Sequence, residues 1–292
     1  MSRPSVWAAA AVERIDRRAT GQELDRTQRI TLNFHPDRAT ARGVPTIEAL
    51  ALDGLYRSQF ETGTSNGGLT AHRGGARWQW ENQLFDGAYD DAPAAERPKY
   101  GALNHRRRAL GGAPRFGSAH FRLVESALDR ATFCFPDSAM NPTDFATAKH
   151  FDLLRLADRF DRMERGPAVE PEEGDLLDGY IEAQVHGVVE LATDVAALVL
   201  DPCYRGTFVE EVAQRLAVEL EWHEGRILTV GELSRRAYYR DPGAQRVGLA
   251  IARDGVLDAR IVGEASRTGR FRAQDLKQVW HLIARFGQPA FG

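Results

Sequence analysis

The sequence predicts an α+β fold, because strand-like and helix-like segments follow one another in mixed order along the chain. The 292 residues are 43% hydrophobic and 27% charged, a composition typical of a folded chain with a core of its own. The strand-like segments do not alternate regularly with helices, as a doubly wound parallel sheet would require. Apolar residues in the last third of the chain recur mostly at helical spacing, which predicts a mainly helical C-terminal extension.

Local patterning predicts each element in order. Residues 5–19 place Ala, Val and Ile on one face of an amphipathic helix, and residues 29–34 alternate apolar and polar side chains as a strand does. A helix is expected from Pro45 to Asp53, because proline favours a first turn and Gly54 favours a helix end. Further strands are expected at 99–103, 117–124, 131–135, 179–187, 196–200 and 227–230, and further helices at 75–84, 146–164, 208–220, 231–239, 244–254 and 273–286.

The charge and cysteine content argue against several classes of partner and structure. With 38 basic and 41 acidic residues the formal net charge is −3, which gives no electrostatic reason to expect tight nucleic-acid binding. The chain contains no run of about 18 apolar residues, so we expect no membrane span. Its N-terminus turns charged at helical spacing, unlike a cleaved signal peptide. The two cysteines, Cys134 and Cys203, form no CxxC pair, which argues against a disulfide framework and favours a cytoplasmic protein.

The segment from Tyr180 to Gly187 carries the strongest chemical signal. Its strict alternation puts apolar side chains on one face of a strand and polar side chains on the other: Ile181, Ala183 and Val185 against Tyr180, Glu182, Gln184 and His186. Such a polar row is costly to bury unless its groups meet water or a ligand. The segment is therefore either a strand with one solvent-facing side or part of a binding site.

Three further segments offer candidate site residues. His35 ends the 29–34 strand, where a side chain can reach into a cleft, although a lone histidine there is often structural and Asp37 can cap a helix. The stretch 57–68 combines small hydrogen-bond donors with glycines, a composition that can wrap an anionic ligand or simply turn a corner. Tyr100 starts a strand beside a glycine, where it can contact a ligand or pack on a neighbour.

Taken together, these segments resemble the ADP-ribosyltransferase superfamily in order and type. His35, the Gly54-Leu55 pair after a helix, Tyr100 and Glu182 match its His-Tyr-Glu branch. That branch implies an NAD cleft between two small antiparallel sheets, with NAD as the substrate. It also implies that His35 contacts the nicotinamide ribose and that Tyr100 stacks on the nicotinamide ring. Glu182 would hydrogen-bond the ribose and stabilise its oxocarbenium-like centre.

The sequence is also similar to the Arg-Ser-Glu branch of the same superfamily. Leu55-Tyr56-Arg57-Ser58 resembles its Leu-Tyr-Arg strand, and Phe116-Gly117-Ser118 resembles its serine strand. Glu182-Ala183-Gln184 departs from its Glu-x-Glu strand, which implies that arginine is not the acceptor. His35 precedes Pro36 where the superfamily usually has glycine, so the choice of branch stays open. The resemblance implies cofactor-binding roles for Arg38, Arg57, Ser58, Ser65, Asn66, Ser118 and Gln184, with Arg38 or Arg57 paired to the pyrophosphate.

A second resemblance covers residues 25–290. Over this length the chain is similar to a bacterial family of uncharacterised proteins that share FHPDR, YRSQFETG-x-SNGG, RPKYGALN and E-x-QVHG segments. This resemblance is more specific than the superfamily one, and it implies no established activity.

These observations predict an N-terminal helix over residues 1–24, an ADP-ribosyltransferase-like core over 25–205, and a helical extension over 206–292 packed on that core. The expected function is transfer of ADP-ribose from NAD to an unidentified acceptor, such as a protein, or hydrolysis of NAD. The alternatives are a non-catalytic binding protein and a metal-dependent hydrolase, in which His35-x-Asp37 supplies two ligands without an HExxH motif. The role as toxin, effector or housekeeping enzyme and the oligomeric state stay open.

Overall fold

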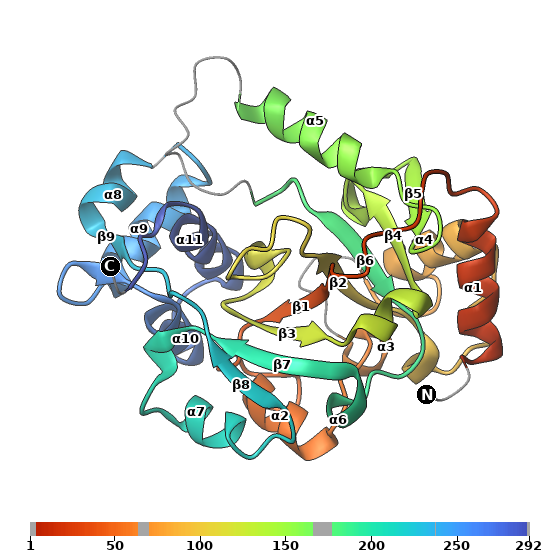
Figure 1. The fold of residues 1–292 in the computed structure, drawn as a ribbon. Helices are drawn as coiled ribbons and strands as arrows, with labels where there is room; N and C mark the ends of the chain where they lie inside the picture. The colour runs from red at the N-terminus through yellow and green to blue at the C-terminus, as the bar shows by residue number, and fades with distance from the viewer. Residues whose placement is uncertain (1–3, 64–69, 166–176, 237, 291–292) are drawn as a thin grey trace.

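One mixed β-sheet organises the part of the chain that the computed structural model describes, residues 4–63, 70–165, 177–236 and 238–290 (Figure 1). Its eight strands lie in the order β5-β4-β6-β2-β1-β3-β7-β8, and β9 pairs with β10 in a separate small sheet. The strands are β1 (Ile30–Phe34), β2 (Lys99–Leu103), β3 (Ala119–Leu123), β4 (Ala131–Phe135), β5 (Asp144–Thr147), β6 (Ile181–Val185), β7 (Val195–Leu200), β8 (Glu219–Trp222), β9 (Leu228–Thr229) and β10 (Val256–Leu257).

The expectation of two small antiparallel sheets is wrong. β1 and β2 pair through Ile30 with Leu103 and through Thr31 with Ala102, and these residue pairs join all eight strands in one sheet. The sheet is also not purely antiparallel, because β7 and β8 run parallel. Local patterning cannot reveal such a junction, since the paired residues lie far apart in the sequence.

The two central strands β1 and β2 stay paired over only a short distance. Their ladder ends at Thr31, while β1 continues along β3 until Phe34 pairs with Ala119. β2 pairs with β6 along its whole length, from Lys99 to Leu103. The C-terminal end of β1 and the N-terminal end of β2 therefore separate in the middle of the sheet.

Both faces of β6 are buried. Ile181 and Val185 point into the apolar core, where both side chains are inaccessible to solvent. The opposite, polar face is also covered, because the segment around α4 packs over it and Phe85 meets the His186 ring edge-on at 5.2 Å. Glu182, on this polar face, is 5% exposed. The interpretation of this strand as solvent-facing on one side is therefore wrong.

Helices enclose the sheet, with α8 to α11 gathered at one end and α1 and α4 at the other (Figure 1). Trp280 of α11 donates its indole N–H to the Pro114 carbonyl at 2.8 Å and so fixes the C-terminal helices to the body of the molecule. The helices are α1 (Val6–Asp16), α2 (Thr46–Asp53), α3 (Gln59–Thr62), α4 (Ala76–Phe85), α5 (Leu153–Arg165), α6 (Leu191–Asp194), α7 (Phe208–Ala213), α8 (Val230–Arg235), α9 (Pro242–Ile251), α10 (Ala259–Arg267) and α11 (Ala273–Phe286). Within the described ranges, no helix is both long enough and apolar enough to cross a membrane.

Two edge strands replace segments expected to be helical. The helix expected from residue 146 begins at Leu153, because Ala146 and Thr147 pair with β4 as part of β5. The helix expected over 208–220 ends at Ala213, and β8 then adds to the main sheet beside β7. The helix expected over 273–286 is α11, with the predicted bounds.

Candidate active site

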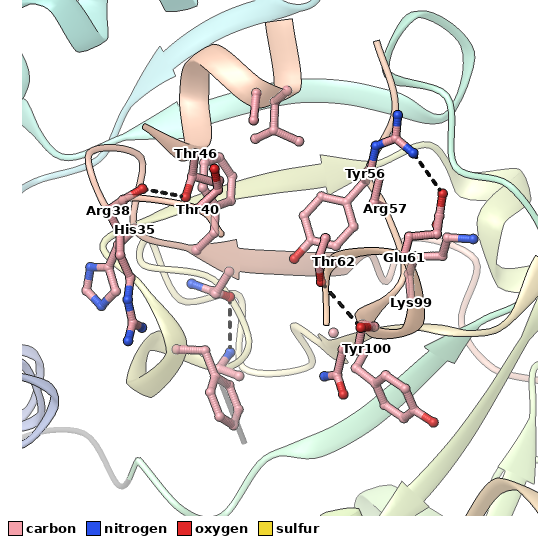
Figure 2. Close-up of a pocket in the computed structure, with 18 of the residues that line it drawn as sticks. His35, Arg38, Thr40, Thr46, Tyr56, Arg57, Glu61, Thr62, Lys99 and Tyr100 are labelled. Carbon is pink, nitrogen blue, oxygen red and sulfur yellow. Dashed lines mark hydrogen bonds and ion pairs between the residues drawn. The ribbon is translucent and has the colours of Figure 1, made fainter. Parts of the chain in front are cut away.

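A cavity of about 890 Å³ opens where β1 and β2 separate (Figure 2). Five of the residues singled out in the sequence line it, although they come from different elements: His35, Arg38, Arg57, Tyr100 and Glu182. In Figure 2, His35 and Arg38 lie at one end of the cavity and Arg57 lies at the other. A volume of this size is typical of a small-molecule or cofactor site.

His35 follows the last residue of β1 and contacts the C-terminal extension. Its ring meets Trp280 of α11 edge-on, with 5.3 Å between the ring centroids. Burial, with smaller contributions from the Arg38 and Lys277 charges, lowers the pKa of His35 to about 3. The imidazole is therefore neutral near pH 7, so that it offers the cavity a hydrogen bond and no charge.

Glu182 presents a carboxyl group that is almost completely buried beside the cavity. Ser138 donates to its Oε2 through the hydroxyl at 2.8 Å and through the backbone N–H at 3.3 Å, and Gln184 donates to its Oε1 at 3.0 Å. Burial raises the pKa of Glu182, while the nearby Arg77 guanidinium and the Ser138 hydrogen bond act to lower it. These contacts hold the carboxyl group in one orientation.

Arg77 on α4 was missed in the sequence and is central to this part of the site. Its side chain lines the cavity, is 3% exposed and donates from Nη1 to the Ser138 hydroxyl at 2.8 Å. Because arginine can only donate, the Ser138 oxygen accepts this bond and its hydrogen points to Glu182. Arg77, Ser138 and Glu182 therefore form a directed chain of hydrogen bonds.

Tyr100 also belongs to this buried network. Its hydroxyl donates to Glu81 Oε1 at 2.7 Å, and Glu81 Oε2 accepts from Arg97 at 2.6 Å. The Arg77 guanidinium lies 3.9 Å from the centroid of the Tyr100 ring. Burial raises the pKa of Tyr100 well above its usual range, so the phenol stays protonated. One face of the ring is thus covered by Arg77, and a stacked ligand would have to use the other face.

Asp137 and Tyr180 form a second polar pair in the cavity wall. Tyr180 belongs to the polar row noted in the sequence, whereas Asp137 was not among the predicted site residues. The Tyr180 hydroxyl donates to Asp137 Oδ2 at 2.6 Å, and the Arg115 guanidinium lies 3.8 Å from the same oxygen. Asp137 and Ser138 come after β4, separated from it by Pro136, and polar residues after a buried strand are the signal that could have identified them.

Tyr56 has a phenol group that faces the cavity. Its ring packs edge-on against Phe121 at 6.2 Å, and no hydrogen bond of its hydroxyl is found in the described chain. Burial alone raises the pKa of Tyr56 to about 12. The hydroxyl is therefore a neutral group that is open to a ligand.

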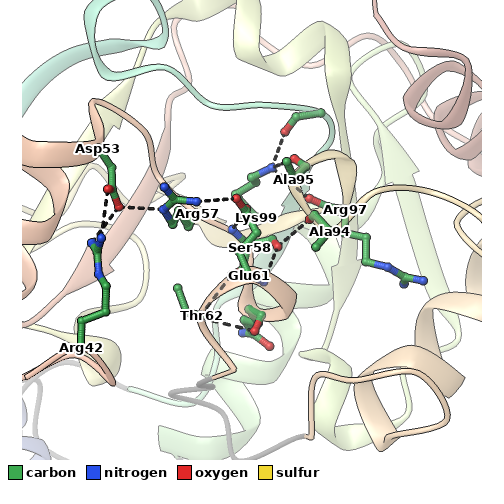
Figure 3. A network of polar contacts seen from close by, with 12 residues as sticks. Arg42, Asp53, Arg57, Ser58, Glu61, Thr62, Ala94, Ala95, Arg97 and Lys99 are labelled. Atoms are coloured by element: carbon green, nitrogen blue, oxygen red, sulfur yellow. Dashed lines mark hydrogen bonds and ion pairs between the residues drawn. The ribbon is translucent and has the colours of Figure 1, made fainter.

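Arg57 lies at the rim of the cavity between two carboxylates (Figure 3). Its guanidinium contacts Asp53 at 2.7 Å and Glu61 at 3.1 Å, and Arg42 contacts the same Asp53 at 2.9 Å. The predicted contact of Arg57 with a pyrophosphate would thus compete with two existing ion pairs.

Three more of the predicted cofactor-binding residues, Ser58, Ser118 and Gln184, have described positions but do not line the cavity. Ser58 caps α3 by accepting from the Glu61 N–H at 3.2 Å. Ser118 contacts the Tyr204 hydroxyl at 3.3 Å, and Gln184 accepts from Thr132 while it donates to Glu182. Ser65 and Asn66 lie outside the described residues.

The charge of the lining favours an anionic ligand. Among the described residues, six basic and four acidic side chains line the cavity, and the basic ones include Arg38, Arg77 and Arg115. Over the ranges that the structure describes, no three His, Cys, Asp or Glu residues converge in a way that could hold a metal ion. Within these ranges, the geometry thus gives no support to the metal-dependent hydrolase alternative.

A family comparison agrees with the wider of the two resemblances. Residues 29–166 and 154–286 match a family model described as a protein of unknown function, DUF3626. No curated protein matches the chain. Because the two matched segments together cover most of the 292 residues, the chain belongs to the DUF3626 family.

Proposed function

We propose that the cavity binds NAD and breaks the bond between nicotinamide and ribose, passing ADP-ribose to an acceptor or to water. The observation that carries this proposal is the convergence of His35, Tyr100 and Glu182 on one cavity. The excess of basic side chains around the cavity also suits a dinucleotide with a diphosphate group.

In the proposed reaction the C–N bond breaks with both electrons going to nicotinamide, which leaves as a neutral base. Positive charge then develops on the ribose, and an oxygen or nitrogen nucleophile of the acceptor attacks the sugar carbon and loses its proton. The Glu182 carboxylate supplies electrostatic stabilisation for this charge, and burial makes the effect stronger than it would be in water.

The residues around Glu182 prepare it for this role. Burial favours a protonated carboxyl group, which would stabilise no cation. Arg77 and Ser138 oppose that tendency, by charge and by hydrogen bonding. Neutral His35 offers a hydrogen bond to a ribose hydroxyl without repelling the developing cation.

Release of nicotinamide from NAD tests the proposal. We expect the wild-type protein to release it and Glu182→Gln to do so about a hundredfold more slowly, because the amide keeps the shape but lacks the negative charge. Glu23→Gln changes an exposed glutamate that does not line the cavity, so this variant is the matched control and should behave like wild type. Equal rates in wild type and Glu182→Gln would refute the assignment. NAD binding without nicotinamide release in wild type would instead favour a non-catalytic binding protein.

A further inference from the structure

The polar face of β6 continues beyond the cavity. Glu182 lines the cavity, whereas Gln184 and His186 follow it on the same face, are inaccessible to solvent and do not line the cavity. A buried polar group costs free energy unless it is hydrogen-bonded, so the partners of these two side chains show what they do.

Four buried side chains form a continuous series of hydrogen bonds that ends at Glu182. The Tyr89 hydroxyl lies 2.6 Å from His186 Nδ1, and His186 Nε2 lies 3.0 Å from the Thr132 hydroxyl on β4. Thr132 lies 2.9 Å from Gln184 Oε1, and Gln184 Nε2 lies 3.0 Å from Glu182 Oε1. We call Tyr89, His186, Thr132 and Gln184 the buried chain, because none of them is more than 1% exposed.

The chemistry of each group fixes where the hydrogens of the buried chain point. Gln184 donates to Glu182 through its amide nitrogen, so its amide oxygen faces Thr132 and can only accept. Thr132 has one hydroxyl hydrogen and gives it to Gln184, and it therefore accepts from His186. Nε2 of His186 accordingly carries the ring hydrogen.

His186 is neutral, which leaves its second ring nitrogen as an acceptor. Burial lowers the pKa of His186 to about 3, and the Arg130 and Lys99 charges act in the same direction. Nδ1 therefore accepts from the Tyr89 hydroxyl, and every hydrogen of the buried chain points toward Glu182.

The Glu182 carboxyl group consequently meets donors at both oxygens. Ser138 donates twice to Oε2, Gln184 donates to Oε1, and the Cys134 thiol lies 3.9 Å from Oε1. Among the described residues no acceptor bonds this carboxyl group. A carboxylate is thus satisfied by its neighbours, whereas a protonated carboxyl group would have no partner for its hydrogen.

Tyr89 opposes a reversal of the buried chain. A half-turn of the Gln184 amide would offer an acceptor to protonated Glu182, but Thr132 would then have to donate to His186. The His186 ring hydrogen would move to Nδ1 and meet Tyr89, whose own hydrogen would lose its acceptor. His186 is the one partner of the Tyr89 hydroxyl in the described part of the chain, so the reversed arrangement leaves a buried donor unpaired.

We infer that Tyr89 and His186 are positioning residues for Glu182: through Thr132 they hold the Gln184 amide with its N–H toward the carboxyl group and so favour the carboxylate. Hydrogen bonds in such a buried network depend on one another, so a change at the far end reaches Glu182. The action of this carboxylate on NAD rests on the proposed function, whereas its control by the buried chain does not.

Other elements also bring titratable or charged groups to Glu182. Arg77 on α4 favours the carboxylate, and Asp137 after β4 opposes it. Burial raises the pKa of the remaining neighbours well above their usual values and keeps them neutral: Tyr100 on β2, Tyr180 before β6 and Cys134 on β4. Tyr89→Phe leaves all of these side chains in place and so isolates the effect of the buried chain.

The ring nitrogens of His186 provide the first test, which requires no NAD. In ¹⁵N NMR of protein labelled in its histidine rings, we expect a neutral His186 with its hydrogen on Nε2. Its Nδ1 signal should move in Tyr89→Phe, which removes the donated hydrogen bond. A ring hydrogen on Nδ1, or a charged ring at pH 7, would overturn the inferred direction.

The ionisation of Glu182 provides the second test, by ¹³C NMR titration of glutamate-labelled protein with Glu182→Gln to assign the signal. We expect the pKa of Glu182 to rise by about half a unit in Tyr89→Phe, a roughly threefold change in proton affinity, and by about one unit in Thr132→Val. Thr132→Ser keeps the hydroxyl and should keep the wild-type pKa. Thr147→Val is the matched control, because this buried threonine pairs with Thr132 across β4 and β5 but its hydroxyl bonds Asp16.

An unchanged pKa of Glu182 in both Tyr89→Phe and Thr132→Val would overturn the inference. With NAD, the acid limb of the kcat profile should move with this pKa while the plateau at high pH is kept, which a general loss of structure would not produce. Shifted pKa values in a protein that releases no nicotinamide would refute the proposed function and leave the role of the buried chain standing.

Discussion

At the scale of single residues, the proposed function requires a buried carboxyl group, that of Glu182, to ionise. Burial of Glu182 raises the pKa of its carboxyl group. The Ser138 hydroxyl lowers this pKa in part, because its hydrogen points at the Glu182 oxygen. The direction of that hydrogen is set by Arg77, which occupies the other side of the same oxygen. A hydroxyl that is oriented in this way stabilises the anion more than one that is free to rotate.

Removal of this hydroxyl should move the pH profile of nicotinamide release. In Ser138→Ala the carboxylate loses a hydrogen bond, so its pKa rises and ionisation requires a higher pH. We expect the acid limb of the kcat profile to shift upward by about one pH unit, with the plateau at high pH reduced much less. Ser234→Ala removes a hydroxyl on α8 and should leave the profile unchanged. An unshifted acid limb in Ser138→Ala would show that the hydroxyl does not influence ionisation of the catalytic group.

At the scale of elements, the end of β1 is positioned by close backbone packing. A Cβ atom at Gly117 would lie 2.0 Å from the carbonyl carbon of Phe34, far inside van der Waals contact. His35 follows Phe34 directly, so any shift of this strand end moves the imidazole and reshapes the cavity. Glycine at 117 is therefore required for close approach and not for a positive φ.

Gly117→Ala should accordingly both destabilise the protein and weaken the site. We expect a loss of about 2 kcal/mol in the free energy of unfolding, as for other overpacked positions, together with weaker NAD binding. Denaturant unfolding and NAD titration measure the two effects. Gly231→Ala is the control, because a Cβ there meets only a side-chain oxygen at 3.9 Å. A Gly117→Ala protein with wild-type stability and affinity would contradict this view of the strand end.

The helices and strands show which features of the fold the sequence can predict and which it cannot. The alternation around Glu182 located β6 and its polar face, and helical spacing located α11. The edge strands β5 and β8 were missed because each has four residues, too few for a clear period of two. The single sheet was missed because two pairs of distant residues join β1 to β2. Elements with a long periodic pattern are visible in the sequence, and pairing between distant segments is not.

Some residues of the candidate site could likewise be predicted from the sequence, and others could not. His35 and Tyr100 stand at the ends of predicted strands, where local sequence marks them, and both line the cavity. Arg77 and Ser138 come from a helix and from a turn after β4, and only folding brings them to Glu182. Gln184 was assigned to the cofactor, but in the structure it donates to Glu182 and lies outside the cavity lining.

At the scale of the whole molecule, the site is assembled from parts of the chain that are far apart. The central strands supply Glu182 and the end of β1, and α4 supplies Arg77. The C-terminal helices contribute Trp280, which packs against His35 from outside the cavity lining. Trp280 contacts the His35 ring and also bonds the Pro114 carbonyl beside Arg115. The C-terminal extension therefore packs against a residue of the cavity wall.

The most direct test of the central claim is a crystal structure of the Glu182→Gln protein with bound NAD. This variant should not cleave the NAD, so the intact dinucleotide should be seen. The account predicts the nicotinamide ribose in the main cavity, with a ribose hydroxyl about 3 Å from the side chain of residue 182. It also predicts the nicotinamide ring beside Tyr100, on the face that Arg77 leaves open. NAD bound elsewhere on the molecule, or bound in the cavity with its ribose remote from residue 182, would contradict the account.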